Sequence, residues 1–277
     1  MFKFGPDTRL TRLMVRLSWP LIKAGKKLSA VPVFKTLINP FFACPLNEVT
    51  AVPIGYRMES PDPVVLPCRV VERLVAAVPD VFIMSACMCR TLCQCSDYLQ
   101  DIGCMALGSP VSRMHPSHGH RATSSEAVRH DRRAARAGLV ADVTHTWIDA
   151  VAFGLIPFNK LMFICFCDDC CCIFRTHMRR RGPNLDRAYK RLPGISVAVD
   201  PERCDGCGLC VQRCFVGAMV LRGGRVQVGD SCKGCGRCAE ICPRQAVSLT
   251  LENEDALVRR LLERIRAVAD IQAEEPT

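Results

Sequence analysis

The C-terminal third of the chain contains one cysteine pattern twice. The pattern is Cys-x2-Cys-x2-Cys-x3-Cys, and its second copy begins 28 residues after the first. The cysteines are Cys204, Cys207, Cys210 and Cys214 in the first copy and Cys232, Cys235, Cys238 and Cys242 in the second. Gly206, Gly208, Ala218 and Leu221 also recur at this offset, as Gly234, Gly236, Ala246 and Leu249. A repeat that extends beyond the cysteines predicts a duplicated structural unit.

This spacing favours iron-sulfur ligation. Three cysteines at three-residue intervals let one tight loop present three thiolates to an iron-sulfur cube, and the fourth cysteine of each run ligates the other cluster. Structural zinc is the alternative. Zinc prefers two Cys-x2-Cys pairs roughly 12 to 20 residues apart and has no use for a third cysteine in the same run. The sequence therefore predicts two [4Fe-4S] clusters.

Residues 196–250 resemble the bacterial two-cluster [4Fe-4S] ferredoxins. All eight ligand positions are present and Pro243 follows the last cysteine as in that family, whereas Phe215 replaces the usual proline of the first run. The predicted ligands are Cys204, Cys207, Cys210 and Cys242 for cluster I, and Cys232, Cys235, Cys238 and Cys214 for cluster II. We expect the interleaved glycines to adopt positive φ angles. Gly223-Gly224, between two apolar runs, predicts a β-hairpin.

Twelve of the 20 cysteines lie before this region. Cys44 and Cys68 are isolated, which is typical of small buried hydrophobic residues. The other ten fall in residues 87–104 and 165–172. Such clustering favours a third iron-sulfur cluster or another metal centre, and reactive thiols or inert packing remain alternatives. Residues 170–172 cannot all point at one centre from regular structure, so our candidate ligands are Cys87, Cys89, Cys104, Cys167 and Cys170.

The region before the repeat resembles uncharacterised ferredoxin-domain proteins of anaerobic microbes. The similarity rests on Cys87-Met88-Cys89-Arg90, Asp101-Ile102-Gly103-Cys104, Ser125-Glu126-Ala127, Gly138-Leu139-Val140 and Ile164-Cys165-Phe166-Cys167. Phe166 departs from the asparagine expected there. The resemblance implies a three-part metalloprotein. Arg90, directly after the Cys-x-Cys, could stabilise the negative charge of a thiolate cluster or bind an anionic substrate. Alternatively, it forms a surface ion pair.

The chain is predicted to have an α+β fold, with a mixed α/β N-terminal domain and a small two-cluster ferredoxin domain of duplicated half-motifs. A strand is expected at residues 50–54, a helix at 64–78, and a capping box at Thr123 and Glu126 before a helix that Gly138 ends. The predicted parts are a basic amphipathic segment (1–47), a Cys-rich α/β domain (48–177), a linker (178–195), the ferredoxin domain (196–251), and a C-terminal helix and tail (252–277).

Positive charge is concentrated in two stretches of a chain whose net charge is +10. Residues 1–47 hold eight Lys or Arg and one acid, and residues 175–191 hold seven and one acid. These patches could bind an acidic redox partner, an anionic membrane face or nucleic acid, or simply be solvated. We expect an acidic redox partner protein and no nucleic acid. The stripe Leu10, Leu13, Met14, Leu17 and Leu21 fits a helix on a membrane surface or one packed on its own domain.

We expect a cytoplasmic protein, with or without peripheral contact of residues 1–47 with the inner membrane face. The N-terminus has no uninterrupted apolar region for secretion, and no apolar run reaches the ~20 residues of a spanning helix. His115, His118 and His120 fit a polar loop better than a metal site. The sequence contains no phosphate loop, dinucleotide-binding fingerprint or Ser-His-Asp arrangement.

The predicted function is electron transfer: two [4Fe-4S] clusters pass single electrons to a third metal centre or a redox partner. Two alternatives stay open. One is an iron-sulfur oxidoreductase with a catalytic metal site in the Cys-rich domain. The other treats residues 48–174 as a docking module of a larger redox complex. Reduction potentials, substrate and oligomeric state do not follow from the sequence.

Overall fold

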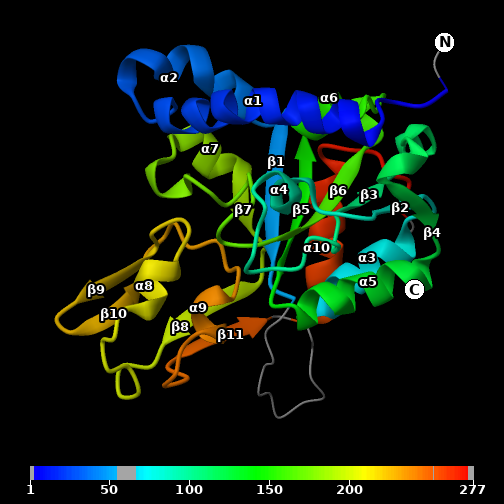
Figure 1. Cartoon of the computed structure of the whole chain (residues 1–277). Helices are drawn as coiled ribbons and strands as arrows, with labels where there is room; N and C mark the ends of the chain where they lie inside the picture. Colours follow the sequence, from blue (N-terminus) through cyan, green and yellow to red (C-terminus); the bar gives the residue numbers. More distant parts are fainter. Residues whose placement is uncertain (1–2, 55–66, 252, 274–277) are drawn as a thin grey trace.

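The chain has an α+β fold built on one seven-stranded mixed sheet (Figure 1). The computed structural model describes residues 3–54, 67–251 and 253–273. The strand order is β4-β2-β3-β6-β5-β1-β7, and all neighbours are antiparallel except β1 and β7. The strands are β1 (Asn47–Val52), β2 (Val81–Met84), β3 (Met105–Leu107), β4 (Gly119–Ala122), β5 (Val140–Thr146), β6 (Met162–Cys167) and β7 (Tyr189–Arg191).

Ten α-helices and five short 3-10 helices surround the sheets in the described residues. The α-helices are α1 (Thr8–Leu28), α2 (Pro32–Ile38), α3 (Pro67–Ala77), α4 (Met88–Leu92), α5 (Ser124–Arg136), α6 (Trp147–Phe153), α7 (Pro183–Ala188), α8 (Leu209–Arg213), α9 (Arg237–Glu240) and α10 (Glu254–Arg266). The 3-10 helices are η1 (Asn39–Phe42), η2 (Ser109–Arg113), η3 (Pro116–His118), η4 (Phe158–Lys160) and η5 (Met178–Arg180). None of these helices is long and apolar enough to cross a membrane.

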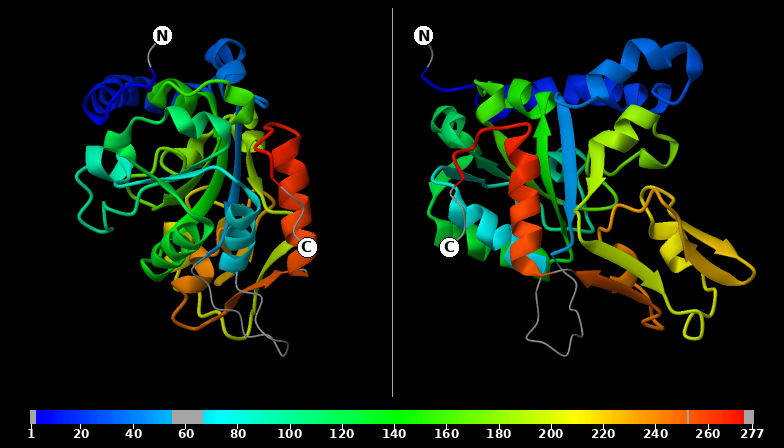
Figure 2. Two further views of the ribbon diagram at one scale, coloured as in Figure 1. Left: turned by 90° about the vertical axis from the view of Figure 1, so that its right-hand side faces the viewer. Right: turned by 180° about the vertical axis from the view of Figure 1, so that it is seen from behind.

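The large sheet separates two hydrophobic cores. Side chains of a strand alternate between its faces, and on β6 Ile164 and Phe166 enter the core under α3, α5 and α10. Phe163, Cys165 and Cys167 enter the opposite core, with residues of α1 and α6. Figure 2 shows α10 along the strands on the face away from α4. The buried cysteines of β6 therefore all lie on one face of the sheet.

Several predicted elements are confirmed. The expected strand at 50–54 is β1, which begins three residues earlier and ends two residues earlier than expected. The expected helix at 64–78 is α3, and residues 64–66 lie outside the described residues. Thr123 and Glu126 form the capping box of α5, and Gly138 follows that helix with a φ of +70°. A glycine is favoured there because a side chain makes positive φ costly.

The N-terminal segment forms a long helix that passes through a proline. Asp7 caps α1 by accepting a hydrogen bond from the backbone N–H of Leu10 at 2.8 Å. Pro20 lies inside α1 and leaves one backbone carbonyl without its helical partner. Pro20 lies on the exposed side of the helix, so water can donate a hydrogen bond to that carbonyl. Pro32 begins α2, and Pro40 lies in η1.

Residues 178–195, the predicted linker, carry η5, α7 and β7. β7 pairs in parallel with β1, with Thr50 opposite Lys190. The segment therefore completes the edge of the large sheet while it connects the two parts of the chain. At the other end of the ferredoxin region, α10 returns and packs on α3.

The C-terminal region contains two small antiparallel pairs. β8 (Ile195–Val199) pairs with β11 (Val247–Leu251), which brings the entry and exit of the region together. β9 (Met219–Arg222) and β10 (Arg225–Val228) form the predicted hairpin around Gly223 and Gly224. Both glycines have positive φ, at +56° and +76°. Helices α8 and α9, one from each half of the repeat, pack on each other.

Candidate metal centres

The two cysteine loops of the repeat share one backbone conformation. Gly206 and Gly208 have φ angles of +74° and +73°, and their counterparts Gly234 and Gly236 have +65° and +82°. Gly208 precedes α8 and Gly236 precedes α9. The expected positive φ of these glycines is confirmed, and the left-handed conformation turns each loop directly into a short helix.

Backbone N–H groups point at sulfur in an equivalent way in both halves. Ala218 donates to Cys214 Sγ at 3.1 Å, and its counterpart Ala246 donates to Cys242 Sγ at 3.3 Å. Gly234 donates to Cys232 Sγ at 3.5 Å. Hydrogen bonds to a thiolate ligand stabilise its negative charge and so tune a bound cluster.

One cavity of the ferredoxin region is lined by cysteines from both halves of the repeat. Its lining includes Cys214, Cys232, Cys235 and Cys238, with Phe215 and Met219 among the apolar neighbours. Burial raises the pKa of Cys238, and Cys235, Cys232 and Cys214 raise it further. Four thiols around one largely apolar cavity are the donor set that a four-cysteine iron-sulfur cluster requires.

Of the other four cysteines of the repeat, Cys207 and Cys242 lie near Cys210. Burial raises the pKa of the Cys210 thiol, and Cys242 and Cys207 raise it as well, against hydrogen bonds from nearby backbone N–H groups. Cys204 begins this loop and donates its backbone N–H to Asp200 at 3.1 Å. Thus Cys242 of the second half lies with cysteines of the first half, as Cys214 lies with those of the second.

A second group of thiols, four buried and two half-buried, lies on the cysteine-bearing face of the large sheet. We call it the inner thiol cluster, and it consists of Cys87, Cys89, Cys104, Cys165, Cys167 and Cys172. Side-chain interactions run in the order Cys165, Cys104, Cys87, Cys89, Cys172, Cys167. The cluster draws on β6, the start of α4, the residue before β3 and the loop after β6.

Two members of the inner thiol cluster have pKa values that their neighbours lower. Hydrogen bonds from Cys104 and Cys89 hold the pKa of Cys87 well below its usual value. Burial opposes ionisation of Cys172, but hydrogen bonds from Cys167 and Cys89 bring its pKa well below the usual value too. The donating thiols have raised pKa values. Metal ligands must be deprotonated, so this arrangement favours ligation.

Two buried cations flank the inner thiol cluster. Arg90 is fully buried, and it donates 2.8 Å hydrogen bonds to the carbonyls of Leu99 and Phe166. It also pairs with Asp168 at 3.4 Å and attracts Cys87 and Cys104. The thiolate-stabilising interpretation of Arg90 is thus supported and the surface ion pair is wrong. Burial lowers the pKa of Lys26 to about 8, against the attraction of Cys172 and Cys89.

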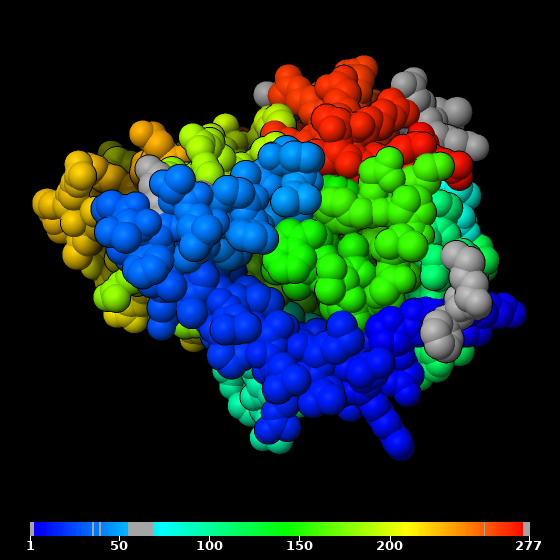
Figure 3. Space-filling view, turned by 90° about the horizontal axis from the view of Figure 1, so that it is seen from above, coloured from blue at the N-terminus to red at the C-terminus, as the bar shows by residue number. Residues whose placement is uncertain are grey.

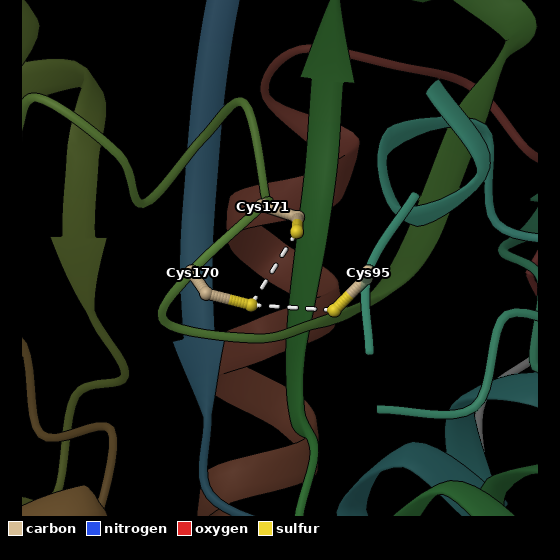
Figure 4. A group of neighbouring side chains, drawn as sticks. All are labelled: Cys95, Cys170 and Cys171. Carbon is tan, nitrogen blue, oxygen red and sulfur yellow. Dashed lines mark hydrogen bonds between the residues drawn. The ribbon is translucent and has the colours of Figure 1, made fainter. Parts of the chain in front are cut away.

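A third group, the outer thiol trio, consists of Cys95, Cys170 and Cys171. Their Sγ atoms lie 3.4 Å apart between Cys95 and Cys170 and between Cys170 and Cys171 (Figure 4). Asp168 holds the loop by accepting hydrogen bonds from the backbone N–H groups of Cys170 at 2.9 Å and Cys172 at 3.2 Å. Adjacent cysteines can converge here because the loop has no regular structure.

The structure therefore divides the predicted ligand pool. Cys87, Cys89, Cys104 and Cys167 belong to the inner thiol cluster, whereas Cys170 belongs to the outer thiol trio. Sequence reasoning missed Cys165, Cys172, Cys95 and Cys171. Cys165 could have been found, because the Cys-x-Cys of a strand places both side chains on one face. Cys44 is exposed, against expectation, and the side chain of Cys68 lies outside the described residues.

One acidic residue lies within ligand distance of the inner thiol cluster. Donor atoms of Asp142, Cys167 and Cys172 all lie within 4.8 Å of one another. Burial raises the pKa of Asp142 to about 7, against the attraction of Arg175. Tyr189 of β7 donates a 2.6 Å hydrogen bond to its Oδ1 atom. Asp142 thus offers an oxygen donor beside the sulfurs.

Asp169 joins the Cys-rich part to the ferredoxin region through two buried arginines. Its Oδ1 accepts hydrogen bonds from Arg175 at 2.6 and 3.0 Å, and its Oδ2 pairs with Arg237 of α9 at 2.6 Å. Arg175 also donates to Cys235 Sγ at 3.6 Å and covers the Phe215 ring at 4.0 Å. Phe215, where ferredoxins have proline, thus packs against the arginine that reaches a cluster II cysteine.

A basic cavity opens beside this junction. It has a volume of about 640 Å³ and is lined from α1, from the loop after β6 and from α8. Its cationic lining residues are Lys23, Lys27, Arg175, Arg179, Arg180 and Arg213, and its sulfur-bearing ones include Cys170 and Cys214. Asp169 is the acid in the lining, and its charge is already paired. The cavity is therefore suited to anions.

The histidine-rich segment has a structural role at the N-terminus. His118 is buried in η3, and its Nε2 lies 3.0 Å from the carbonyl oxygen of Pro6. His115 caps η3 by accepting from the backbone N–H of Ser117 at 3.2 Å. Among the described residues, no histidine joins a group with metal-ligand geometry.

Comparison with known proteins matches only the C-terminal region. No curated protein matches the chain. A family model described as a 4Fe-4S binding domain matches residues 197–220 and 228–248. Together the two matches contain all eight repeat cysteines, four in each, so that each match covers one half-motif. The C-terminal region of this chain is therefore a 4Fe-4S binding domain of the ferredoxin type.

Proposed function

We propose that the chain is an electron-transfer protein that binds two [4Fe-4S] clusters and passes single electrons to a third metal centre or a redox partner. Cluster I would be held by Cys204, Cys207, Cys210 and Cys242, and cluster II by Cys214, Cys232, Cys235 and Cys238. When bound, such clusters supply one-electron redox chemistry. The observation that carries the proposal is the cavity to which both halves of the repeat contribute cysteines.

The inner thiol cluster is our candidate for the third centre. Its six thiols interact in series, four of them buried and two half-buried, and the pKa values of Cys87 and Cys172 are lowered. Lys26 and Arg90 offset the negative charge that metal-bound thiolates bring into a buried site. Asp142 supplies an oxygen donor. These features support a metal centre more than reactive thiols, which require access from solvent.

The basic cavity is our candidate docking site for an acidic redox partner protein. Its cations line the same cavity as Cys214, a ligand that we assign to cluster II, so a carboxylate-rich surface would be drawn close to this cluster. The cations gather around one concavity beside a cluster ligand. This suits the side chains of a protein better than the extended phosphate backbone of a nucleic acid.

A second candidate function is an iron-sulfur oxidoreductase, and one observation favours it. Cys170 of the outer thiol trio also lines the basic cavity. A metal held by Cys95, Cys170 and Cys171 would have three protein ligands, and a position open to an anionic substrate is typical of catalytic sites. Lys23, Arg179 and Arg213 would then bind and orient that substrate.

Iron and acid-labile sulfide per chain, measured after anaerobic purification, test these proposals together with EPR of the reduced protein. About twelve irons per chain supports two cubes and a third cluster, and about eight leaves the inner thiol cluster without one. A colourless chain that holds zinc at the repeat cysteines overturns electron transfer. Cyanide that perturbs one EPR signal, while the ferredoxin signals stay unchanged, favours the oxidoreductase because an iron then lacks a cysteine ligand.

A further inference from the structure

The apolar stripe of α1 faces away from the protein. Leu10, Leu13, Leu17 and Leu21 are 50%, 53%, 68% and 74% exposed. The opposite face of the same helix is buried, with Thr11, Val15 and Trp19 against the body of the molecule. A leucine side chain gains about 1.5 to 3 kcal/mol when it leaves water completely. Four such side chains in one exposed row thus form a surface that favours an apolar partner.

The exposed surface continues beyond α1. Val33, Leu37 and Phe41 of α2 and η1 are 82%, 72% and 55% exposed, and Val151 of α6 and Ile156 are 57% and 58% exposed. Figure 1 shows α1, α2 and α6 along one side of the molecule, and Figure 3 views that side directly. Single exposed apolar residues are ordinary on a protein surface, but many of them on one side of the molecule are typical of an interaction site.

The stripe cannot turn inward, because α1 is fixed to the body along its other face. Ser29, which follows α1, accepts a 3.0 Å hydrogen bond from the backbone N–H of Gly182. Lys26 reaches the carbonyl oxygens of the loop after β6. Thr11 donates to the carbonyl of Ala152 at 3.2 Å. The outward direction of the leucines is therefore set by buried polar contacts as well as by packing.

Positive charge borders the stripe on one side. A helix turns about 100° per residue, and this places Arg9, Arg12 and Arg16 within an arc of about 60° beside the leucines. Asp7 is the single acid of residues 1–47, and it is used as the helix cap. An apolar row with cations along its border matches the interface of an anionic bilayer, where long basic side chains reach the headgroups while the leucines enter the acyl region.

We propose that the outward surface of α1, α2 and η1, which we call the leucine face, binds the surface of an anionic lipid bilayer. The helix would lie in the plane of the interface and not cross it. In this orientation the ferredoxin domain lies at the end of the molecule away from the bilayer (Figure 1). The lipid therefore orients the protein and leaves the cluster-bearing domain accessible.

Vesicle sedimentation with the anaerobically purified full chain tests this proposal. We expect binding to vesicles of 70% phosphatidylcholine and 30% phosphatidylglycerol to exceed binding to pure phosphatidylcholine by about tenfold or more, and to weaken in high salt. The double variant Leu17→Gln/Leu21→Gln should weaken binding at least about tenfold, since it removes two exposed leucines that the bilayer would bury. Arg9→Gln/Arg16→Gln should remove most of the preference for the anionic vesicle.

Leu99→Gln is the matched control, because Leu99 is 55% exposed and lies outside the leucine face. It should bind vesicles like the unchanged protein, and all variants should keep their iron content and visible absorbance. Absence of vesicle binding, or equal losses from Leu99→Gln and Leu17→Gln/Leu21→Gln, overturns the proposal. A concentration-dependent dimer that only Leu17→Gln/Leu21→Gln abolishes, without lipid binding, assigns the leucine face to a second copy of the chain instead.

Discussion

Arg175 donates a hydrogen bond from its Nη2 atom to the Sγ atom of Cys235 at 3.6 Å. The arginine belongs to the loop that follows β6, whereas the cysteine belongs to the ferredoxin domain. The Arg175 side chain is fully buried, and Asp169 and Phe215 hold it in place. A buried cation at a cluster ligand stabilises the more negative, reduced state of that cluster. In the proposed assignment, the Cys-rich part of the chain would thus contribute to the redox properties of cluster II.

Arg175→Met should lower the reduction potential of cluster II. A hydrogen bond to a charged group contributes about 1.5 kcal/mol, and about 59 mV corresponds to 1.4 kcal/mol for one electron, so we expect a shift on the order of 50 mV. EPR-monitored redox titration measures it, and cluster I serves as the internal reference. Arg244→Met is a control, because that side chain forms an exposed pair with Asp205. Equal shifts of both clusters in Arg175→Met would contradict a local effect.

Cys207→Ser and Cys242→Ser should damage the same cluster, although 35 positions separate them. Cys214→Ser and Cys235→Ser should damage the other one. Each substitution removes one thiolate from a set that draws on both halves of the repeat. EPR of the reduced variants distinguishes the two signals. If Cys207→Ser and Cys242→Ser lose different signals, the exchange of the fourth cysteine is wrong.

Cys87→Ser/Cys172→Ser should lower the iron content from about twelve to about eight per chain and keep both ferredoxin signals. These two thiols are the members of the inner thiol cluster whose pKa values are lowered by their neighbours. Cys44→Ser is the control, because Cys44 is exposed and lies in neither thiol group. If Cys95→Ser removes the third centre while Cys87→Ser/Cys172→Ser retains it, the centre belongs to the outer thiol trio.

Asp131→Asn should stabilise the protein, and increasingly so at higher pH. Asp131 is fully buried in α5, and neither carboxylate oxygen has a hydrogen-bond partner among the described residues. Burial, with the nearby Glu72, raises the pKa of Asp131 well above its usual value. The folded state therefore binds the proton more tightly, and the stability that this gives is lost as pH rises above about 4.

Thermal unfolding at pH 6 and pH 8 measures this effect. We expect Asp131→Asn to gain about 1 to 3 kcal/mol, with the larger gain at pH 8. Asp101→Asn is the opposite case, because the hydrogen bond from Arg133 lowers the pKa of Asp101. That exposed pair contributes little, and its removal should not stabilise the protein at either pH. A gain from Asp131→Asn that is larger at pH 6 would show that the carboxylate is not the costly form.

The features that the sequence predicted well depend on local geometry. The two cysteine loops need only a short spacing and glycines with positive φ, and Gly206 and Gly234 supply them. The capping box of α5 joins Thr123 to a residue three positions away. The apolar stripe of α1 was visible in the sequence, but the pattern could not decide which face packs inward. The buried face turned out to use Thr11, Val15 and Trp19.

The features that the sequence could not predict depend on contacts between distant segments. Cys172 joins the inner thiol cluster because an irregular loop folds back over the sheet, and no periodicity describes such a loop. Lys26 reaches that cluster from α1, nearly 150 positions earlier. β7 was expected within a linker, since three residues carry little strand signal, and its pairing with β1 is a tertiary contact.

The pairing of Ile195 with Leu251 has a mechanical consequence. The chain enters the ferredoxin domain after β7, which pairs with β1, and it leaves the domain into α10, which packs on α3. The domain is therefore attached to the rest of the protein at both of its ends. A domain on a single flexible tether can swing between donors and acceptors, but this one is held at a fixed distance from the buried cysteines. In the proposed electron transfer, exchange with the rest of the chain would then need no domain motion, and a redox partner would have to approach the domain.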